Sequence, residues 1–164
     1  MPVQGAGRRT TSTERAVRIR PSFARGRAFE DTDSTMSQQN VAVARRWVEL
    51  FNERSDVDEF LSLHDPEVEL QTPGGPRLQG HDQVRDWFDA GFENVQSRII
   101  PERFVAEGDI VVGLGRIVVR WIESGEVVHD GESAGAFWFR DGKIIAWQPF
   151  ETHAAALKET GLEG

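Results

Sequence analysis

The four residues Arg140-Asp141-Gly142-Lys143 constrain the fold of this chain more tightly than any other stretch. Asp-Gly between two apolar runs is a strong signal for a two-residue β-hairpin, because a type I′ turn requires positive φ at both central residues. We therefore expect a hairpin that runs from Gly131 to Glu151 and is closed by Arg140 and Lys143. Both faces of this hairpin are largely apolar, which predicts that both are covered by other elements.

Counting outward from this turn predicts which side chains share a face, because directly paired residues in an antiparallel hairpin do so. The count places Glu132 opposite Glu151 and Trp147 opposite Ala136. One face would therefore carry an apolar surface that ends in two opposed carboxylates. The alternative is that Pro149, which cannot donate to a sheet ladder, marks a β-bulge that turns Glu151 toward solvent.

The same count extends across the turns at Ser124-Gly125 and Gly108. It adds Glu102 and Phe104 to the face of the two glutamates, together with small residues at its centre. The opposite face, which suits solvent or a subunit contact, is predicted to carry three basic or titratable residues: Arg116, Arg120 and His129.

The composition excludes several kinds of site. No cysteine is present among the 164 residues, which removes disulfides, thiolate nucleophiles and Cys-ligated metal sites. With 38% hydrophobic residues, five Trp and ten Phe, the chain can fill one core. No apolar run reaches the length of a membrane span or signal-peptide core, so we expect a cytoplasmic protein without a membrane partner.

The charge is distributed unevenly. Residues 1–35 contain seven Arg and four acidic residues, a net charge of +3, whereas residues 36–164 carry the rest of the overall −8, a net −11. An acidic body argues against a nucleic-acid partner, because neutralising phosphates dominates that affinity. The Arg-rich leader, residues 1–35, follows no sustained apolar period and is expected to be disordered.

Three origins of this leader remain open: an upstream start codon whose product is not the natural protein, a flexible basic tail, or a transit peptide. The first is favoured because Met36-Ser37 opens the folded pattern at once. A domain is therefore expected over residues 36–164.

Helical spacing of apolar residues predicts three helices before the sheet. The first is capped by Ser37 and stops near Asn52, the second runs from about Val57 to Asp65-Pro66, and the third begins at Gly80. A short helix capped by Thr152 closes the chain. Between them we expect a short strand at Val68 and Leu70 and an antiparallel meander of strands near Ser97–Glu107, Asp109–Ile122, Val127–Arg140 and Lys143–Glu151. This order predicts an α+β fold.

A set of short motifs carries a family resemblance when the motifs are taken in order. They are Met36-Ser37-Gln38-Gln39-Asn40-Val41, Phe51-Asn52, Leu63-His64-Asp65-Pro66-Glu67-Val68-Glu69, Gly80-His81-Asp82-Gln83-Val84-Arg85, Arg140-Asp141-Gly142-Lys143-Ile144 and the closing Ala156-Leu157 and Gly161-Leu162. With these motifs, residues 36–163 resemble the SnoaL-like proteins of the nuclear-transport-factor-2-like superfamily. The resemblance implies a cone in which a curved antiparallel sheet holds three helices on its concave face, with a pocket between them and frequent homodimers. The implied functions range from polyketide cyclases, steroid isomerases and epoxide hydrolases to binding modules, so the fold does not fix the function.

The known chemistries of such proteins can be compared with this chain position by position. By resemblance, the positions of the three catalytic residues of ketosteroid isomerases, a tyrosine, a general base and an acid, are occupied here by Trp47, Thr72 and Glu132. The chain has no tyrosine, and threonine cannot act as a general base near neutral pH, so that mechanism is lost. The aspartates of limonene-epoxide hydrolases would fall near Ile117 and Pro149, so that mechanism fails as well. Trp147 matches a pocket tryptophan of that group.

The candidate catalytic residues are therefore Glu132 and Glu151, since one of two opposed, partly buried carboxylates is expected to hold a proton and serve as a general acid. The expected ligand-binding residues are Trp47, Phe51, His64, Trp87, Glu102, Phe104 and Trp147, although His64 also fits the edge of a core. The pairs His64-Asp65, His81-Asp82 and His129-Asp130 lack a convergent geometry, so no metal and no cofactor is expected.

These observations predict a pocket protein that binds a small, mostly apolar organic ligand. Acid–base chemistry of the isomerase, cyclase or hydrolase type is one version of this function. A non-catalytic ligand carrier or dimerisation module is the alternative, and whether the protein is an enzyme stays open.

Overall fold

The computed structural model describes residues 27–91 and 94–162, with side chains from Thr35 onward. The chain divides into two units, Met1–Thr35 and Met36–Gly164. The described helices are α1 (Arg27–Glu53), α2 (Val57–Ser62), α3 (Gly80–Ala90) and α4 (His153–Thr160). The described strands are β1 (His64–Gln71), β2 (Arg77–Gln79), β3 (Val95–Glu107), β4 (Ile110–Trp121), β5 (Val127–Arg140) and β6 (Lys143–Phe150).

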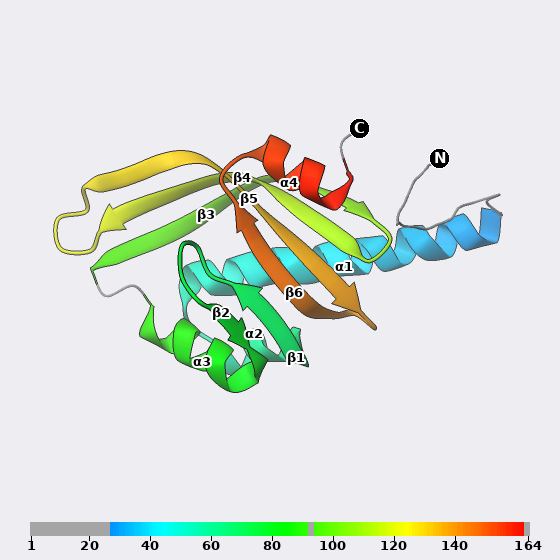
Figure 1. Ribbon diagram of the computed structural model, residues 1–164, viewed down its shortest axis with the longest axis horizontal. Coiled ribbons are helices and arrows are strands. Elements are labelled where there is room, and N and C mark those ends of the chain that lie inside the picture. The colour runs from blue at the N-terminus through cyan, green and yellow to red at the C-terminus, as the bar shows by residue number, and fades with distance from the viewer. Residues whose placement is uncertain (1–26, 92–93, 163–164) are drawn as a thin grey trace. The chain divides into compact units, whose positions relative to one another are not determined.

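The six strands form one curved sheet in the order β2-β1-β6-β5-β4-β3 (Figure 1). Strands β3 to β6 make the predicted antiparallel meander. Strand β2 pairs with β1 in the antiparallel direction. The one parallel pair in the described sheet joins β1 to β6. This α+β architecture, with helices before and after the sheet, confirms the predicted fold class.

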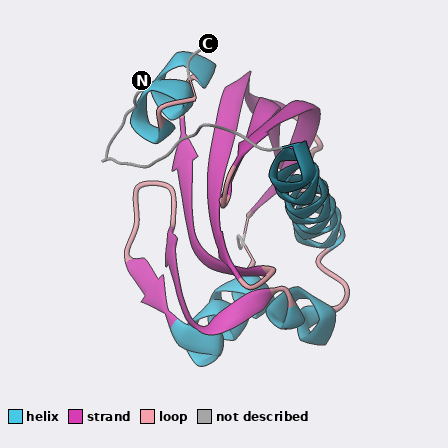
Figure 2. Ribbon diagram, turned by 90° about the vertical axis from the view of Figure 1, so that its right-hand side faces the viewer, coloured by secondary structure: helices cyan, strands magenta, loops and turns pink. Residues whose placement is uncertain are grey.

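The two faces of the sheet belong to two apolar clusters. The inner face carries Val111, Phe137 and Trp147, which pack with side chains of α1, α2 and α3. The outer face carries Val112, Ala134 and Ala136, which pack with residues of α4. Figure 2 shows α1 and α4 on opposite sides of the strands. The prediction that the β5–β6 hairpin is covered on both faces is therefore confirmed.

Local sequence signals determine several elements directly. Asp141 and Gly142 have φ values of 53° and 80°, as a type I′ turn requires, and Phe139 lies opposite Ile144 as predicted. Helix α3 begins at Gly80, with Asp82 in its first turn, where the helix dipole favours an acid. The Thr152 side chain caps α4, which ends at left-handed Gly161.

The predicted register fails one step beyond the turn. A β-bulge between Trp138 and Phe139 leaves Ile145 as an extra residue in β6, so Ala146 rather than Ile145 lies opposite Trp138. A shift of one residue sends every later side chain to the other face. Phe137 therefore pairs with Trp147, and the strand partner of Gly135 is Pro149.

The neighbouring strands also differ from the count. Gly113 lies opposite Gly135 rather than Ala136, and His129 lies opposite Val119 on the inner face, so the prediction of an outer-face His129 is wrong. Arg116 lies on the outer, solvent-facing side, as predicted, but it shares that face with Glu132, its strand partner, rather than lying opposite to it. Its guanidinium forms an ion pair with Asp130. On β3, Phe104 does lie opposite Gly113, but a bulge between Pro101 and Arg103 removes Glu102 from the register.

Two predicted helix ends need correction. Helix α1 already begins at Arg27, so Ser37 lies inside a helix and not at its cap, and Arg27–Thr35 are helical rather than irregular. Helix α2 ends at Ser62, because His64 already starts β1. The disorder predicted for residues 1–26 falls outside the described residues. In the described part of the chain, no helix combines the length and the apolar character that a membrane span needs.

Candidate functional site

A cavity of about 800 Å³ lies between the inner face of the sheet and the helices. Its apolar walls come from three places: α1, α3 and the inner faces of strands β3 to β6. The apolar side chains that line it include Trp47, Val48, Phe51, Trp87, Ile99, Phe104, Ile117, Val119, Phe137 and Trp147. Small-molecule sites are typically apolar clefts of about 300–1,000 Å³, so this cavity has the size and character of a ligand pocket.

Aromatic side chains form the deep part of the wall. The Trp47 ring is stacked on Phe51 at 5.5 Å and lies 4.8 Å from the ring of Trp147, with all distances between centroids. Phe137 meets Trp47 edge-on at 5.4 Å. These tryptophans pack against each other and still leave the cavity open, so the alternative of a pocket filled by indole rings is not the observed arrangement.

The helical side of this wall is tied to the sheet by polar contacts. The side-chain amide of Asn52 donates to the carbonyl of Ile99 and accepts from its backbone N–H, both at 2.8 Å. This pairing satisfies both backbone groups of Ile99 on β3, the strand at the edge of the sheet. It holds the end of α1 against the rim of the cavity.

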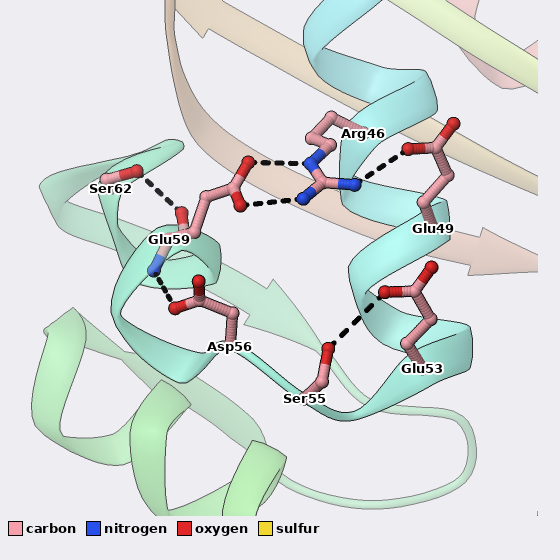
Figure 3. Close-up of polar contacts among 7 residues, drawn as sticks. All are labelled: Arg46, Glu49, Glu53, Ser55, Asp56, Glu59 and Ser62. Atoms are coloured by element: carbon pink, nitrogen blue, oxygen red, sulfur yellow. Dashed lines mark hydrogen bonds and ion pairs between the residues drawn. The ribbon is translucent and has the colours of Figure 1, made fainter.

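A second polar contact fixes α1 to α2. The Arg46 guanidinium forms a two-pronged ion pair with Glu59, with N–O distances of 2.6 and 2.7 Å, and also reaches Glu49 at 2.9 Å (Figure 3). The hydrogen bonds from Arg46 lower the pKa of the Glu59 carboxyl. This bidentate geometry orients the helix that carries Trp47 and Phe51.

Three glycines of the inner face are explained by close neighbours. A Cβ at Gly113 would lie 3.1 Å from the Phe104 ring, and one at Gly135 would lie 2.8 Å from Nε1 of Trp147. At Gly115 the obstacle is backbone, since a Cβ would come within 2.1 Å of the Ile100 carbonyl oxygen. These glycines make room for the walls of the cavity. Of the small residues predicted to share the face of Glu132, Gly113 and Gly115 lie on the inner face, whereas Ala134 and Ala136 lie on the outer face.

The predicted carboxylate pair does not form. Glu132 lies opposite Arg116 on the outer-face register, and its carboxylate accepts a hydrogen bond from the backbone N–H of His153, the first residue of α4. Glu151 follows the end of β6 and is exposed. Both residues border the cavity, but their side chains do not face each other across a strand pair. The bulge near Ile145 is the physical reason, and it lies earlier in β6 than the bulge considered at Pro149.

The other predicted site residues divide into two groups. Trp47, Phe51, Trp87, Phe104 and Trp147 line the cavity, as expected. Glu102 is an exposed bulge residue on β3, outside the lining. His64 is buried behind Trp47, and burial lowers its pKa to about 4. It supports the wall and is not part of it.

Polar residues near the cavity were missed by sequence reasoning. Ser97 lines it from the inner face of β3, His129 and Ser133 line it from the inner face of β5, and Thr72 lines it from the loop after β1. Counting every second residue back from buried Phe137 reaches Ser133 and His129, so alternation could have found them once Phe137 was placed inside. Thr72 donates its hydroxyl to the Pro76 carbonyl, which holds its loop in place.

The two positions where the resemblance to limonene-epoxide hydrolases would lead one to expect aspartates are occupied by apolar residues on the wall. Ile117 and Pro149 both line the cavity, and both are apolar. Among the side chains described, those of residues 35–91 and 94–162, no three of His, Asp or Glu lie close enough to hold a metal ion.

Comparisons with known proteins agree with this geometry. A family model described as the SnoaL-like domain matches residues 44–147. No curated protein matches the chain. Among solved structures, an NTF2-like protein of unknown function from Burkholderia pseudomallei has a TM-score of 0.62 at 21% identity and covers 73% of this chain and 95% of its own.

Two further solved structures carry names that refer to an activity. A protein from Xanthomonas campestris, whose suggested activity is that of a polyketide cyclase, has a TM-score of 0.62 at 17% identity, covering 75% of this chain and 97% of that one. An LEH-like epoxide hydrolase from Mycobacterium tuberculosis has a TM-score of 0.60 at 14% identity, covering 76% and 94%. Such low identities show a shared fold and not a shared activity. With the family match over residues 44–147, this chain belongs to the SnoaL-like domain family.

Proposed function

We propose that this protein binds one small, mostly apolar organic molecule in the cavity beneath α1. The observation that carries the proposal is the cavity itself, about 800 Å³ with a predominantly apolar and aromatic lining. Its deep wall is braced from behind, because Trp47 is fully buried and its N–H is bonded to His64. A wall held in this way is largely formed before the ligand arrives, which limits the ordering cost of binding.

The geometry favours binding over acid–base catalysis. A general acid must come within hydrogen-bond reach of the reacting atom. The Glu132 carboxylate is engaged at the start of α4, and exposed Glu151 has no opposed partner, so the two do not form a buried pair at the apolar end. A carrier or sensor of an apolar molecule needs only the walls, and these are present.

The proposal is tested with tetralin as an apolar probe, by thermal shift and calorimetry. A ligand that binds only the folded state raises Tm with concentration, so wild-type protein should show a saturable shift. Ile117 lines the cavity, and Ile117→Trp should fill it and abolish the shift. Val118 is its neighbour on the outer face, and Val118→Trp should leave the shift intact. The proposal would be contradicted if both variants bound tetralin with the same affinity, or if the wild type did not bind tetralin.

Association of two chains is a separate proposal. The family resemblance predicts a homodimer, and sedimentation equilibrium should give twice the mass of one chain. A single-chain mass over the whole concentration range would exclude it.

A further inference from the structure

Trp147 occupies a central place in the cavity wall. It lies on β6, opposite Phe137 of β5 on one side and Leu70 of β1 on the other. Only 6% of its surface is exposed, and it lines the cavity. Its indole is therefore a buried group that any occupant of the cavity would meet.

The two tryptophans that touch in this wall differ in their hydrogen bonding. The Trp47 N–H donates to Nε2 of His64 at 3.0 Å. Among the described residues, no side chain or backbone group accepts from the Trp147 N–H. Tryptophan nitrogen is a donor only, and a buried indole N–H normally has a partner because leaving it unpaired is costly.

The location of the nitrogen explains why the protein supplies no acceptor. Nε1 of Trp147 lies over Gly135, where even a Cβ would come within 2.8 Å. Neither Gly135 nor its strand partner Pro149 has a side-chain atom that could accept a hydrogen bond. Gly135, Pro149 and Trp147 all line the cavity, so an occupant placed beside Gly135 would approach this nitrogen.

We infer that the buried N–H of Trp147 is a polar recognition element of the cavity, and that it selects ligands that carry a carbonyl oxygen on an otherwise apolar frame. This inference rests on the proposed ligand-binding function. A carbonyl satisfies a lone N–H donor and brings no donor of its own. A hydroxyl would bring an O–H donor that needs an acceptor of its own, and a pure hydrocarbon would bury the N–H without an acceptor.

The test compares 1-tetralone with tetralin, which have the same ring frame with and without a carbonyl. Calorimetry on the wild type should give a Kd for 1-tetralone about 3- to 10-fold below that for tetralin, as expected for one neutral hydrogen bond. Trp147→Phe removes the N–H and keeps an aromatic ring, so the two Kd values should become equal. Trp87→Phe is the matched control, since it makes the same exchange elsewhere on the wall and should preserve the preference.

A second measurement uses the wild type and does not require the Trp147→Phe variant to be stable. In a ¹H–¹⁵N spectrum of the indole groups, one of the five tryptophan N–H signals should move downfield with 1-tetralone and not with tetralin. The Trp47 N–H, already bonded to His64, should not be that signal, and Trp47→Phe and Trp87→Phe spectra assign the others in the wall.

The outcomes separate this inference from the function on which it rests. If the probes bind equally well to the wild type, or if the preference survives in Trp147→Phe, the inference is overturned while the proposed function stands. If no indole signal responds specifically to 1-tetralone, the inference is overturned as well. If neither probe binds, the proposed function fails and the inference fails with it.

Discussion

The indole N–H of Trp47 donates a 3.0 Å hydrogen bond to Nε2 of His64, and Nδ1 of the same imidazole lies 2.8 Å from the carbonyl oxygen of Phe60. An indole N–H can only donate and a carbonyl can only accept, so the imidazole carries its proton on Nδ1 and is neutral. A second proton on Nε2 would point at the Trp47 N–H. The wall of the cavity therefore depends on an uncharged histidine.

This dependence predicts a loss of stability in mild acid. Burial lowers the pKa of His64 to about 4, and neighbouring His81, which bonds to the His64 carbonyl, disfavours the charged form further. The unfolded chain binds the proton near pH 6.5, so stability is complete above that pH and falls as the pH drops toward 4. The loss should be about 2 kcal/mol at pH 5 and about 3 kcal/mol in all.

Urea unfolding at pH 7 and pH 5 measures this effect. His64→Gln, which does not titrate, should be less stable at pH 7 but should show a much flatter dependence between these pH values. Exposed His129 supplies the control, because His129→Gln should keep the full wild-type slope. An unchanged slope in His64→Gln would assign the acid sensitivity to other groups.

The three inner-face glycines should tolerate a methyl group in a defined order. Gly115→Ala places a Cβ 2.1 Å from a backbone oxygen and should cost about 3 kcal/mol or more, because backbone must move. Gly135→Ala meets the edge of the Trp147 ring at 2.8 Å, so it should cost about 1–3 kcal/mol and shift the indole signal. Gly113→Ala, at 3.1 Å from the Phe104 ring, should be the mildest.

Denaturant midpoints of the three variants check this order. The order would be wrong if Gly113→Ala were the most damaging of the three. A Gly135→Ala variant that keeps both its stability and its Trp147 signal would show that the indole does not lie over this glycine.

Removing the charge of Glu132 should affect stability and leave binding unchanged. Its carboxylate sits at the first N–H of α4, where an anion is favoured by roughly 0.3–1 kcal/mol. Glu132→Gln should lose about that much stability and bind tetralin with an unchanged Kd. Exposed Glu151→Gln should change neither quantity. A several-fold change in Kd for either variant would restore a role for these glutamates at the ligand.

The Arg46–Glu59 ion pair should be sensitive to the shape of the cation. Arg46→Lys keeps the charge but cannot form two parallel hydrogen bonds with one carboxylate, so Tm should fall by a few degrees at low salt. Arg77, which reaches Glu69 through one 3.4 Å contact, is the control, and Arg77→Lys should leave Tm unchanged. Equal Tm values for both variants would show that the bidentate geometry adds nothing.

Much of the fold could be predicted because its signals are local. Asp141-Gly142 allows only a tight reversal, Thr152 and Gly161 delimit α4, and alternation along β5 separates two apolar faces. The aromatic wall could be predicted for a similar reason. Trp47 and Phe51 are four residues apart on one helix, and such side chains lie on the same face.

The candidate catalytic pair could not be predicted correctly. The face assigned to a side chain by counting from the turn depends on the pairing of every residue between that side chain and the turn. One extra residue, Ile145, was enough to move Glu132 away from Glu151. Nothing in the amino-acid order marks this bulge, since the apolar run Ile144-Ile145-Ala146 fits either register equally well.

The sequence by itself determined the turns, the helix ends near the C-terminus, the order of the four meander strands β3 to β6 and the family. Only the tertiary structure decided that β1 joins β6 in parallel, that His64 supports Trp47, and that Nε1 of Trp147 lies over Gly135. The physical reason is the range of the interactions. A turn or a cap is decided by adjacent residues, whereas a buried hydrogen bond depends on distant segments that meet only when the core closes.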